Sequence, residues 1–329
     1  MRNSTDYPED NEEFYLIFLV FNILFLIIGI LGNMAVIIYN IYLNQDKTSS
    51  SWLVANLAIA DLLVCLTLYP MKILAFFLHE DLIWKIGLPA CGVSSFLSTM
   101  FLLFITVDRY VFIAKPLKYP SIVISRRIKV ANRCIWLVAA SLLLVLVSVY
   151  MAGEKSAYST LVLLHIFLLL TPIAIIAFLN YKILKIVREQ RQRMASETGV
   201  QSEQVKLEDI QQAGPTQSSD EQERPAQERE EKSNSEHTER SSEQYIAWLH
   251  HIVKELKAVK TFAIIFAILT CCYVPYIIIM LLQLFCWHMC FSNDVLLAKH
   301  IVLELIGINS IANAFVYALR HRRYSKAFL

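Results

Sequence analysis

Charged residues are scarce in this sequence. Asp, Glu, Lys and Arg together make up 18% of its 329 residues, whereas 56% are apolar, and the net charge is only +2. A soluble domain has a larger charged share, and a nucleic-acid-binding domain is more basic. The chain is therefore predicted to be an integral membrane protein with no nucleic-acid partner.

Several chemical motifs are also missing. The sequence has no Gly-rich phosphate loop, no internal repeat, no His and Cys cluster at metal-ligand spacing, and no nucleophile accompanied by a base. A membrane enzyme is thus not indicated. A secondary transporter is an alternative class, but such proteins tend to show paired repeats with interrupted helices. Residues 1–13 are acidic and polar, not a cleavable signal peptide, so the first apolar stretch is expected to direct insertion.

Long apolar stretches are what the sequence has instead. A span needs about 20 mostly apolar residues to cross about 30 Å of hydrocarbon, and helices satisfy their own backbone there. Seven stretches qualify, at 14–42, 52–78, 86–112, 129–151, 157–187, 254–285 and 295–319. The predicted fold is an all-α, seven-transmembrane helix bundle.

Basic residues near the spans predict the topology, because Lys and Arg mark the cytoplasmic side. They crowd the loop between spans three and four (Lys115, Lys118, Arg126, Arg127, Lys129 and Arg133) and the segment after span seven (Arg320, Arg322, Arg323 and Lys326). The C-terminus is therefore expected inside and the N-terminus outside. The sequon at Asn3 is a candidate glycosylation site.

The predicted domains follow from these spans. Residues 1–13 form an extracellular segment, 14–189 hold spans one to five, and 253–319 hold spans six and seven. Residues 190–252 are rich in Gln, Glu, Ser and Arg and poor in apolar residues. This composition predicts a mostly disordered cytoplasmic loop with helical extensions of both spans at its edges. Residues 320–329 are expected to begin a cytoplasmic amphipathic helix.

Polar residues inside the spans are costly unless they are paired or hydrated. Those expected at similar depths are Asn33, Asp61, Ser94, Ser98, Asn309, Ser310 and Asn313. They are either interhelical hydrogen-bonding partners or an oxygen-rich site for a small cation. Oxygen ligands alone do not identify the ion.

Short motifs along the chain resemble those of the rhodopsin-like (class A) family of G-protein-coupled receptors. They are "GNMAV" around Asn33, "NLAIADLL" around Asp61, "DRY" at 108–110, Trp136, Pro172, "CCYVPY" around Pro275 and "NAFVY" at 313–317. The short second extracellular loop and "PLKYPSIVISRR" are loosely similar to melanocortin and adenosine receptors. Peptide, lipid and nucleoside ligands all stay open.

The resemblance implies a receptor in the plasma membrane with an activation switch. Its members here would be Asp108, Arg109, Tyr110, Glu255, Tyr273, Pro275, Asn313 and Tyr317. Arg109 would pair with Asp108 and Glu255 until an extracellular ligand moves span six and admits a heterotrimeric G protein. Arrestin, receptor kinases and membrane lipid are further expected partners. The structural alternative is a charge pair that only anchors a helix end.

The resemblance also implies an allosteric sodium ion, with no other cofactor. It would lie at Asp61 and Ser98, with Ser94, Asn309, Ser310 and Asn313 around it. Ala314 stands where the family has proline, and Tyr273 where it usually has tryptophan. A receptor-like protein that has lost signalling is therefore an alternative function.

The ligand is not identified by these motifs. No acid precedes Asp108 on span three, which disfavours a monoamine, and Gly307 stands where an opsin has its lysine. The candidate ligand contacts are Lys72, Cys91, Tyr273 and Glu304. Lys72 and Glu304 either pair with each other or contact a polar ligand, whereas His165 is expected to be a packing residue.

Cysteine spacing gives two further expectations. Cys286 and Cys290 are candidates for a local disulfide. Cys91 lies about two helical turns closer to Arg109 than the family's loop cysteine does. Span three is therefore expected to be short, with a free, water-accessible Cys91 at its deep outer end. The alternative is that residues 84–90 simply continue the helix through Pro89.

Overall fold

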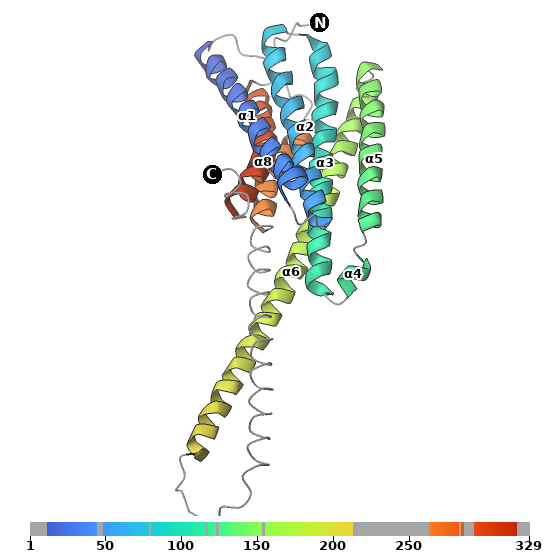
Figure 1. Cartoon of the computed structure of the whole chain (residues 1–329). Helices are drawn as coiled ribbons and strands as arrows, with labels where there is room; N and C mark the ends of the chain where they lie inside the picture. The colour runs from blue at the N-terminus through green and yellow to red at the C-terminus, as the bar shows by residue number, and fades with distance from the viewer. Residues whose placement is uncertain are drawn as a thin grey trace, which may run out of the picture. The chain divides into compact units, whose positions relative to one another are not determined.

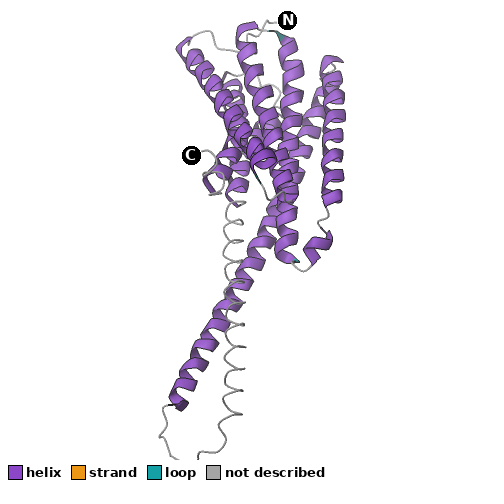
Figure 2. Ribbon diagram, viewed as in Figure 1, coloured by secondary structure: helices purple, strands orange, loops and turns teal. Residues whose placement is uncertain are grey.

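The structure is a computed structural model that describes residues 12–44, 49–78, 80–115, 118–122, 125–152, 155–212, 263–282, 284–285 and 293–320. The regular structure in these ranges is helical throughout (Figure 2). The predictions at Asn3, Glu255, Cys286 and Cys290, and for residues 321–329, fall outside the described residues.

The helices follow one another as α1 (Glu12–Ile38), the π-helical turn η1 (Tyr39–Leu43), α2 (Ser49–Leu78), α3 (Asp81–Ala114), α4 (Tyr119–Ile122), α5 (Ser125–Ala152), α6 (Lys155–Gln212) and α8 (Asn293–Arg320). Residues 263–282 form a further helix, here called the sixth transmembrane helix. Seven of the described helices are long and apolar enough to cross a membrane. The predicted number of spans is confirmed.

The chain divides into two compact units, residues 1–181 with 261–329, and residues 182–260. In the second unit the described residues, 182–212, all belong to α6. The predicted loop 190–252 thus begins with a helical segment, and its residues 213–252 lie outside the described part of the chain. The first unit contains the helix bundle.

The centre of the bundle is built on α2 and α3. α2 packs against α1, α3 and α8, and α3 also packs against α5 (Figure 1). The indole N–H of Trp136 on α5 donates to Asn56 Oδ1 of α2 at 3.0 Å. Outward-facing leucines such as Leu31 on α1 and Leu137 on α5 are exposed, as expected for side chains that meet lipid. Among the buried polar residues, Asp61, Ser98, Asn309, Ser310 and Asn313 lie on α2, α3 and α8.

α3 corrects the expectation of a short third span. It runs from Asp81 to Ala114, 34 residues, with Pro89 inside it. Cys91 is free and buried, 3% exposed, so it is not the water-accessible residue that was expected. A proline removes one backbone hydrogen bond, but neighbouring helices make this tolerable in a transmembrane helix. The alternative in which residues 84–90 continue the helix is the correct one.

Candidate functional site

Asp61 lies at the junction of three helices and is fully buried. Its Oδ1 accepts a hydrogen bond from Ser98 Oγ of α3 at 2.6 Å. Its Oδ2 accepts one from Asn313 Nδ2 of α8 at 3.0 Å. Ser310 lies beside the same carboxyl group. Asp61 thus joins α2 to α3 and α8, and we call Asp61, Ser98, Asn309, Ser310 and Asn313 the polar cluster.

Several oxygen atoms around this junction have no hydrogen-bond partner among the described residues. Asn309 is fully buried, and neither atom of its amide is bonded. The side-chain oxygens of Asn33 and Asn313 are also without partners. Asn33 instead uses its Nδ2 to donate to Gly29 O at 3.0 Å and Ser310 O at 3.4 Å. Buried polar atoms left in this way indicate a place for water or an ion.

Ser94 is predicted to belong to this cluster, but its hydroxyl donates to Ala90 O of its own helix at 2.8 Å. It lies one turn, about 6 Å along the axis, from Ser98. No three described His, Cys, Asp or Glu side chains converge as a transition-metal site would require. One carboxylate with neutral oxygens around it is the kind of donor set that hard cations prefer.

The C-terminal end of α3 carries the Asp108–Arg109 ion pair, in which Asp108 Oδ2 and an Arg109 guanidinium nitrogen are 3.2 Å apart. Tyr119 OH of α4 donates to Asp108 Oδ1 at 2.9 Å, and its ring meets the edge of Phe112 at 5.0 Å. The Asp108 side chain is 4% exposed and the Arg109 side chain 19%. The carboxylate is thus held on both oxygens, and the guanidinium faces a more accessible surface. Tyr110 beside it is half-buried.

Lys72 of α2 and Glu304 of α8 form an ion pair, so the first of the two interpretations of these residues is correct. The lysine Nζ also lies 4.3 Å from the ring centroid of Phe18 on α1. The Lys72 side chain is 1% exposed and that of Glu304 13%. A cation that is this deeply buried needs both the carboxylate and the aromatic face. The pair fastens α8 to α2 on the side of the bundle opposite the Arg109 end.

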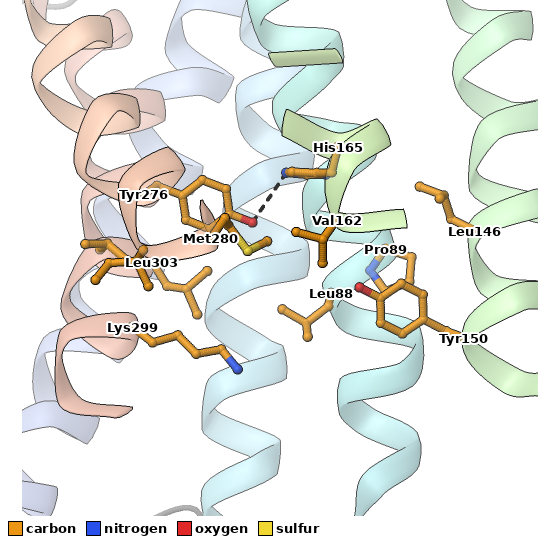
Figure 3. Close-up of a pocket in the computed structure, with 12 residues that line it drawn as sticks. Leu88, Pro89, Leu146, Tyr150, Val162, His165, Tyr276, Met280, Lys299 and Leu303 are labelled. Atoms are coloured by element: carbon orange, nitrogen blue, oxygen red, sulfur yellow. Dashed lines mark hydrogen bonds between the residues drawn. The ribbon is translucent and has the colours of Figure 1, made fainter. Parts of the chain in front are cut away.

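A separate cavity lies between α3, α5, α6, the sixth transmembrane helix and α8. Its walls are mostly apolar, and Figure 3 shows His165, Tyr150 and Lys299 projecting toward the same space. Tyr276 OH and His165 Nε2 are 3.3 Å apart and link the sixth transmembrane helix to α6. Of the four predicted ligand contacts, Cys91 and Tyr273 are buried in the core, and none of the four lines this cavity.

His165 occupies a position that Gly92 of α3 leaves open. A Cβ on Gly92 would lie 2.5 Å from His165 Cε1. His165 is expected from the sequence to be a packing residue, and no sequence motif indicates Tyr276 or Lys299 as part of a site. The pairing of His165 with Tyr276 joins residues 111 positions apart, so no local pattern could have revealed it.

Comparison with known proteins is consistent with this geometry. The sequence profile of the family described as "7 transmembrane receptor (rhodopsin family)" matches residues 32–317. The chain belongs to this family. It is a multi-pass membrane protein of the receptor type, and the predicted resemblance is confirmed.

Relatives in the rhodopsin family include adrenergic receptors. The chain is 27% identical to the alpha-1D adrenergic receptor of Sus scrofa over 337 aligned positions, 94% of this chain and 55% of that protein. It is 24% identical to the human alpha-1A adrenergic receptor, over 92% of this chain and 65% of that protein. The alpha-1A receptor of Oryzias latipes is 30% identical over 123 residues, 35% of this chain and 26% of that protein. The chain thus spans less than two thirds of each of these relatives.

Ala314 and Tyr273, which differ from the residues usual in the rhodopsin family, both lie inside the bundle. Ala314 is buried, and its Cβ would lie 3.2 Å from a Cβ added to Gly32 of α1. The small pair allows α1 and α8 to approach closely. Tyr273 is fully buried near Ser95 and Asp61, and Tyr317 is also buried. Ala314 and Tyr273, the two residues that differ from the family, are therefore packed into the centre of the bundle.

Proposed function

We propose that this protein is a receptor that couples an extracellular ligand to a heterotrimeric G protein through Arg109. The main support is the Asp108–Arg109 pair at 3.2 Å, with Tyr119 bound to the second carboxylate oxygen. In the resting state Asp108 holds the guanidinium. A ligand that prefers a second arrangement of the sixth transmembrane helix shifts the equilibrium toward it, and Arg109 then becomes available to the G protein.

The proposal also includes the orientation of the chain in the membrane and its protein partners. The Arg109 end faces the cytoplasm, as the basic residues of the loop between α3 and α5 indicate. The N-terminus is extracellular, the location is the plasma membrane, and arrestin and receptor kinases act on the cytoplasmic face after activation. The adrenergic relatives support G-protein coupling as the class of activity.

The polar cluster fits a sodium ion as an allosteric partner of this receptor. Asp61 supplies the charge, and Ser98, Ser310, Asn309 and Asn313 supply neutral oxygens. The fit rests on the amide oxygens of Asn309 and Asn313, which are buried without partners among the described residues. An ion that prefers the resting conformation lowers agonist affinity by linkage.

The experiment that tests G-protein coupling is receptor-dependent nucleotide exchange in nanodiscs containing the purified protein. Asp108→Asn removes the charge that holds Arg109, so basal exchange is expected to rise up to about fivefold, equivalent to about 1 kcal/mol for a partly exposed pair. Glu189→Gln, which alters an exposed pair on α6, is the matched control.

Two outcomes of this experiment would contradict the proposal. No exchange above that of empty nanodiscs, in the wild type and in Asp108→Asn, would favour a receptor-like protein that no longer signals. The substituted residues Ala314 and Tyr273 are the observation behind that second candidate. Equal basal exchange in wild type and Asp108→Asn would instead exclude Asp108 as the restraint.

A further inference from the structure

We propose that the N-terminal end of α5 binds an anionic phospholipid of the inner leaflet, one whose head group carries phosphate monoesters. The binding groups are Arg126, Lys129 and Arg133, which we call the basic stripe. The side of the membrane rests on the proposed function, in which the Arg109 end is cytoplasmic. The lipid would be a partner at a site distinct from Arg109 and from the polar cluster.

α5 lies at the edge of the helix bundle (Figure 1), and one of its faces is exposed along the helix. Leu137 and Leu144 on this face are 68% and 71% exposed. Arg126, Lys129 and Arg133 are exposed too. Arg126 precedes Leu144 by about five helical turns, and Arg133 precedes Leu137 by about one turn. The basic stripe therefore continues the lipid-facing apolar surface of α5 toward its N-terminal end.

The opposite face of α5 packs against the bundle. Ile135, Ala139 and Leu146 are buried, and the Trp136 indole is bonded to Asn56 of α2. Because these contacts fix the rotation of α5 about its own axis, they also fix the direction of the basic stripe. It faces the surrounding membrane and not α3.

The charge of this surface favours an anion. Residues 115–152 contain no Asp or Glu, and none of the ion pairs between described residues involves Arg126, Lys129 or Arg133. A Lys or Arg beside an anionic membrane surface contributes a factor of about five in affinity. A lipid with no net charge would gain little from three cations on one helix face.

The spacing of the basic stripe along α5 favours a large head group. Leu137 is the first large apolar residue after the stripe that is exposed. Arg133 lies about 6 Å from it along the axis, whereas Lys129 and Arg126 lie about 12 and 17 Å from it. The head-group layer of one leaflet is only about 5–8 Å thick. Arg133 is thus at the depth of a phosphodiester, and the other two meet a head group that extends further from the hydrocarbon.

An inositol that bears phosphate monoesters has this reach. Each monoester offers several charged oxygen atoms, and an arginine can bind two of them through parallel hydrogen bonds. The acyl chains of the same lipid would lie along Leu137 and Leu144, which are exposed on the same face. The lipid would therefore contact α5 with both its head and its tails.

Binding can be measured without a G protein, by native mass spectrometry of the purified receptor in detergent. The probes are a phosphatidylinositol bisphosphate, phosphatidylserine and phosphatidylcholine with the same acyl chains, and a soluble inositol trisphosphate as the head group alone. The bisphosphate lipid is expected to bind most tightly and phosphatidylcholine least. The soluble head group should bind at least about tenfold more weakly than the lipid, since it leaves the apolar surface unused.

Substitutions on the exposed face test the head-group contact. Each of Arg126→Gln, Lys129→Gln and Arg133→Gln should weaken the bisphosphate lipid about fivefold, and the triple variant about a hundredfold. Val130 is 49% exposed beside the stripe. Val130→Glu should weaken the lipid at least about tenfold by adding a like charge, whereas Val130→Gln should retain it. Lys85→Gln is the control for net charge, because Lys85 lies near the other end of the bundle, at the start of α3.

The stripe and Val130 are exposed, so these variants should fold, which far-ultraviolet circular dichroism checks. Equal binding of phosphatidylcholine and the bisphosphate lipid, or bisphosphate binding unchanged in the triple variant, overturns the lipid site. Nucleotide exchange lowered in the triple variant, with its lipid binding unchanged, would assign the stripe to the G protein instead. Lipid binding that depends on the stripe, in a receptor without exchange above empty nanodiscs, supports the site and counts against the receptor function alone.

Discussion

Removal of Lys72 should destabilise the folded receptor strongly, because it leaves Glu304 without its partner inside the membrane. The Lys72 side chain is 1% exposed and contacts both the Glu304 carboxylate and the Phe18 ring. Loss of one partner of a buried pair costs about 3–5 kcal/mol, a large part of the roughly 5–15 kcal/mol that stabilises a typical protein. For Lys72→Met we expect the midpoint of thermal unfolding to fall by about 6–12 °C.

The double variant Lys72→Met/Glu304→Leu separates the charge from the packing. If the loss comes from the unpaired carboxylate, replacing both residues by apolar ones of similar volume should restore most of the stability. Such a cycle gives the coupling energy of the pair directly. Lys185→Met is the matched control, since Lys185 and Glu189 are 4.0 Å apart with side chains 64% and 50% exposed. That change should cost no more than about 0.5 kcal/mol.

The assay is thermal unfolding of the purified protein in nanodiscs, followed by a thiol-reactive fluorophore that gains access to the buried cysteines Cys65, Cys91 and Cys272 when the chain unfolds. A midpoint for Lys72→Met equal to that of Lys185→Met would refute the reasoning outright. A double variant no more stable than Lys72→Met would show that the alkyl chain of the lysine, and not its charge, is what the bundle needs.

Three further predictions concern the polar cluster, the switch and the cavity. Asp61→Asn should abolish a sodium effect on agonist affinity that is about fivefold or more in the wild type; equal wild-type affinities in sodium and in a large organic cation would exclude the ion site. Glu255→Ala should raise basal nucleotide exchange modestly, because a pair with Arg109 near water is partly screened; no change at equal surface expression would count against that restraint. Gly92→Ala should lower stability by about 1–3 kcal/mol, since the new Cβ would lie 2.5 Å from His165; a midpoint equal to wild type would show that the ring can move aside freely.

The spans and the polar cluster could be predicted because their signals are local. An apolar run of the right length identifies a transmembrane helix by itself. Asp61, Ser98 and Asn313 could be grouped because buried polar groups in lipid must find partners at their own depth. The same depth estimate includes Ser94, whose hydroxyl lies one turn from Ser98 and donates to Ala90 O. Depth specifies a layer of the bundle only to within about a turn, 5.4 Å.

The third span and the cavity could not be predicted in the same manner. The expectation of a short span depends on comparing the spacing of Cys91 from Arg109 with that of the family, and Pro89 disfavours an unbroken helix without excluding one. In a membrane the backbone must satisfy itself, and so a helix continues through a proline that its neighbours support. The cavity depends on the rotation of α6 and the sixth transmembrane helix about their own axes. The rotation of these two helices sets the contacts of His165 with Tyr276 and Gly92. The hydropathy of the sequence carries no information about that rotation.

The sixth transmembrane helix is well placed to couple the cavity to the polar cluster. Tyr276 lines the cavity, and Tyr273, three residues earlier and so less than one turn away, is buried near Asp61 and Ser95. α3 also connects the two regions, and Pro89 and Ser98 are about 14 Å apart along one continuous helix. A ligand that moves Tyr276 by a fraction of a turn would also move Tyr273, about 4.5 Å along the helix, whereas a push at Pro89 would have to travel about three times as far to reach Ser98. Tyr273 stands where the family usually has tryptophan, and its hydroxyl is buried without a hydrogen-bond partner among the described residues, so a shift of the sixth transmembrane helix that brings this hydroxyl to a partner would be favourable.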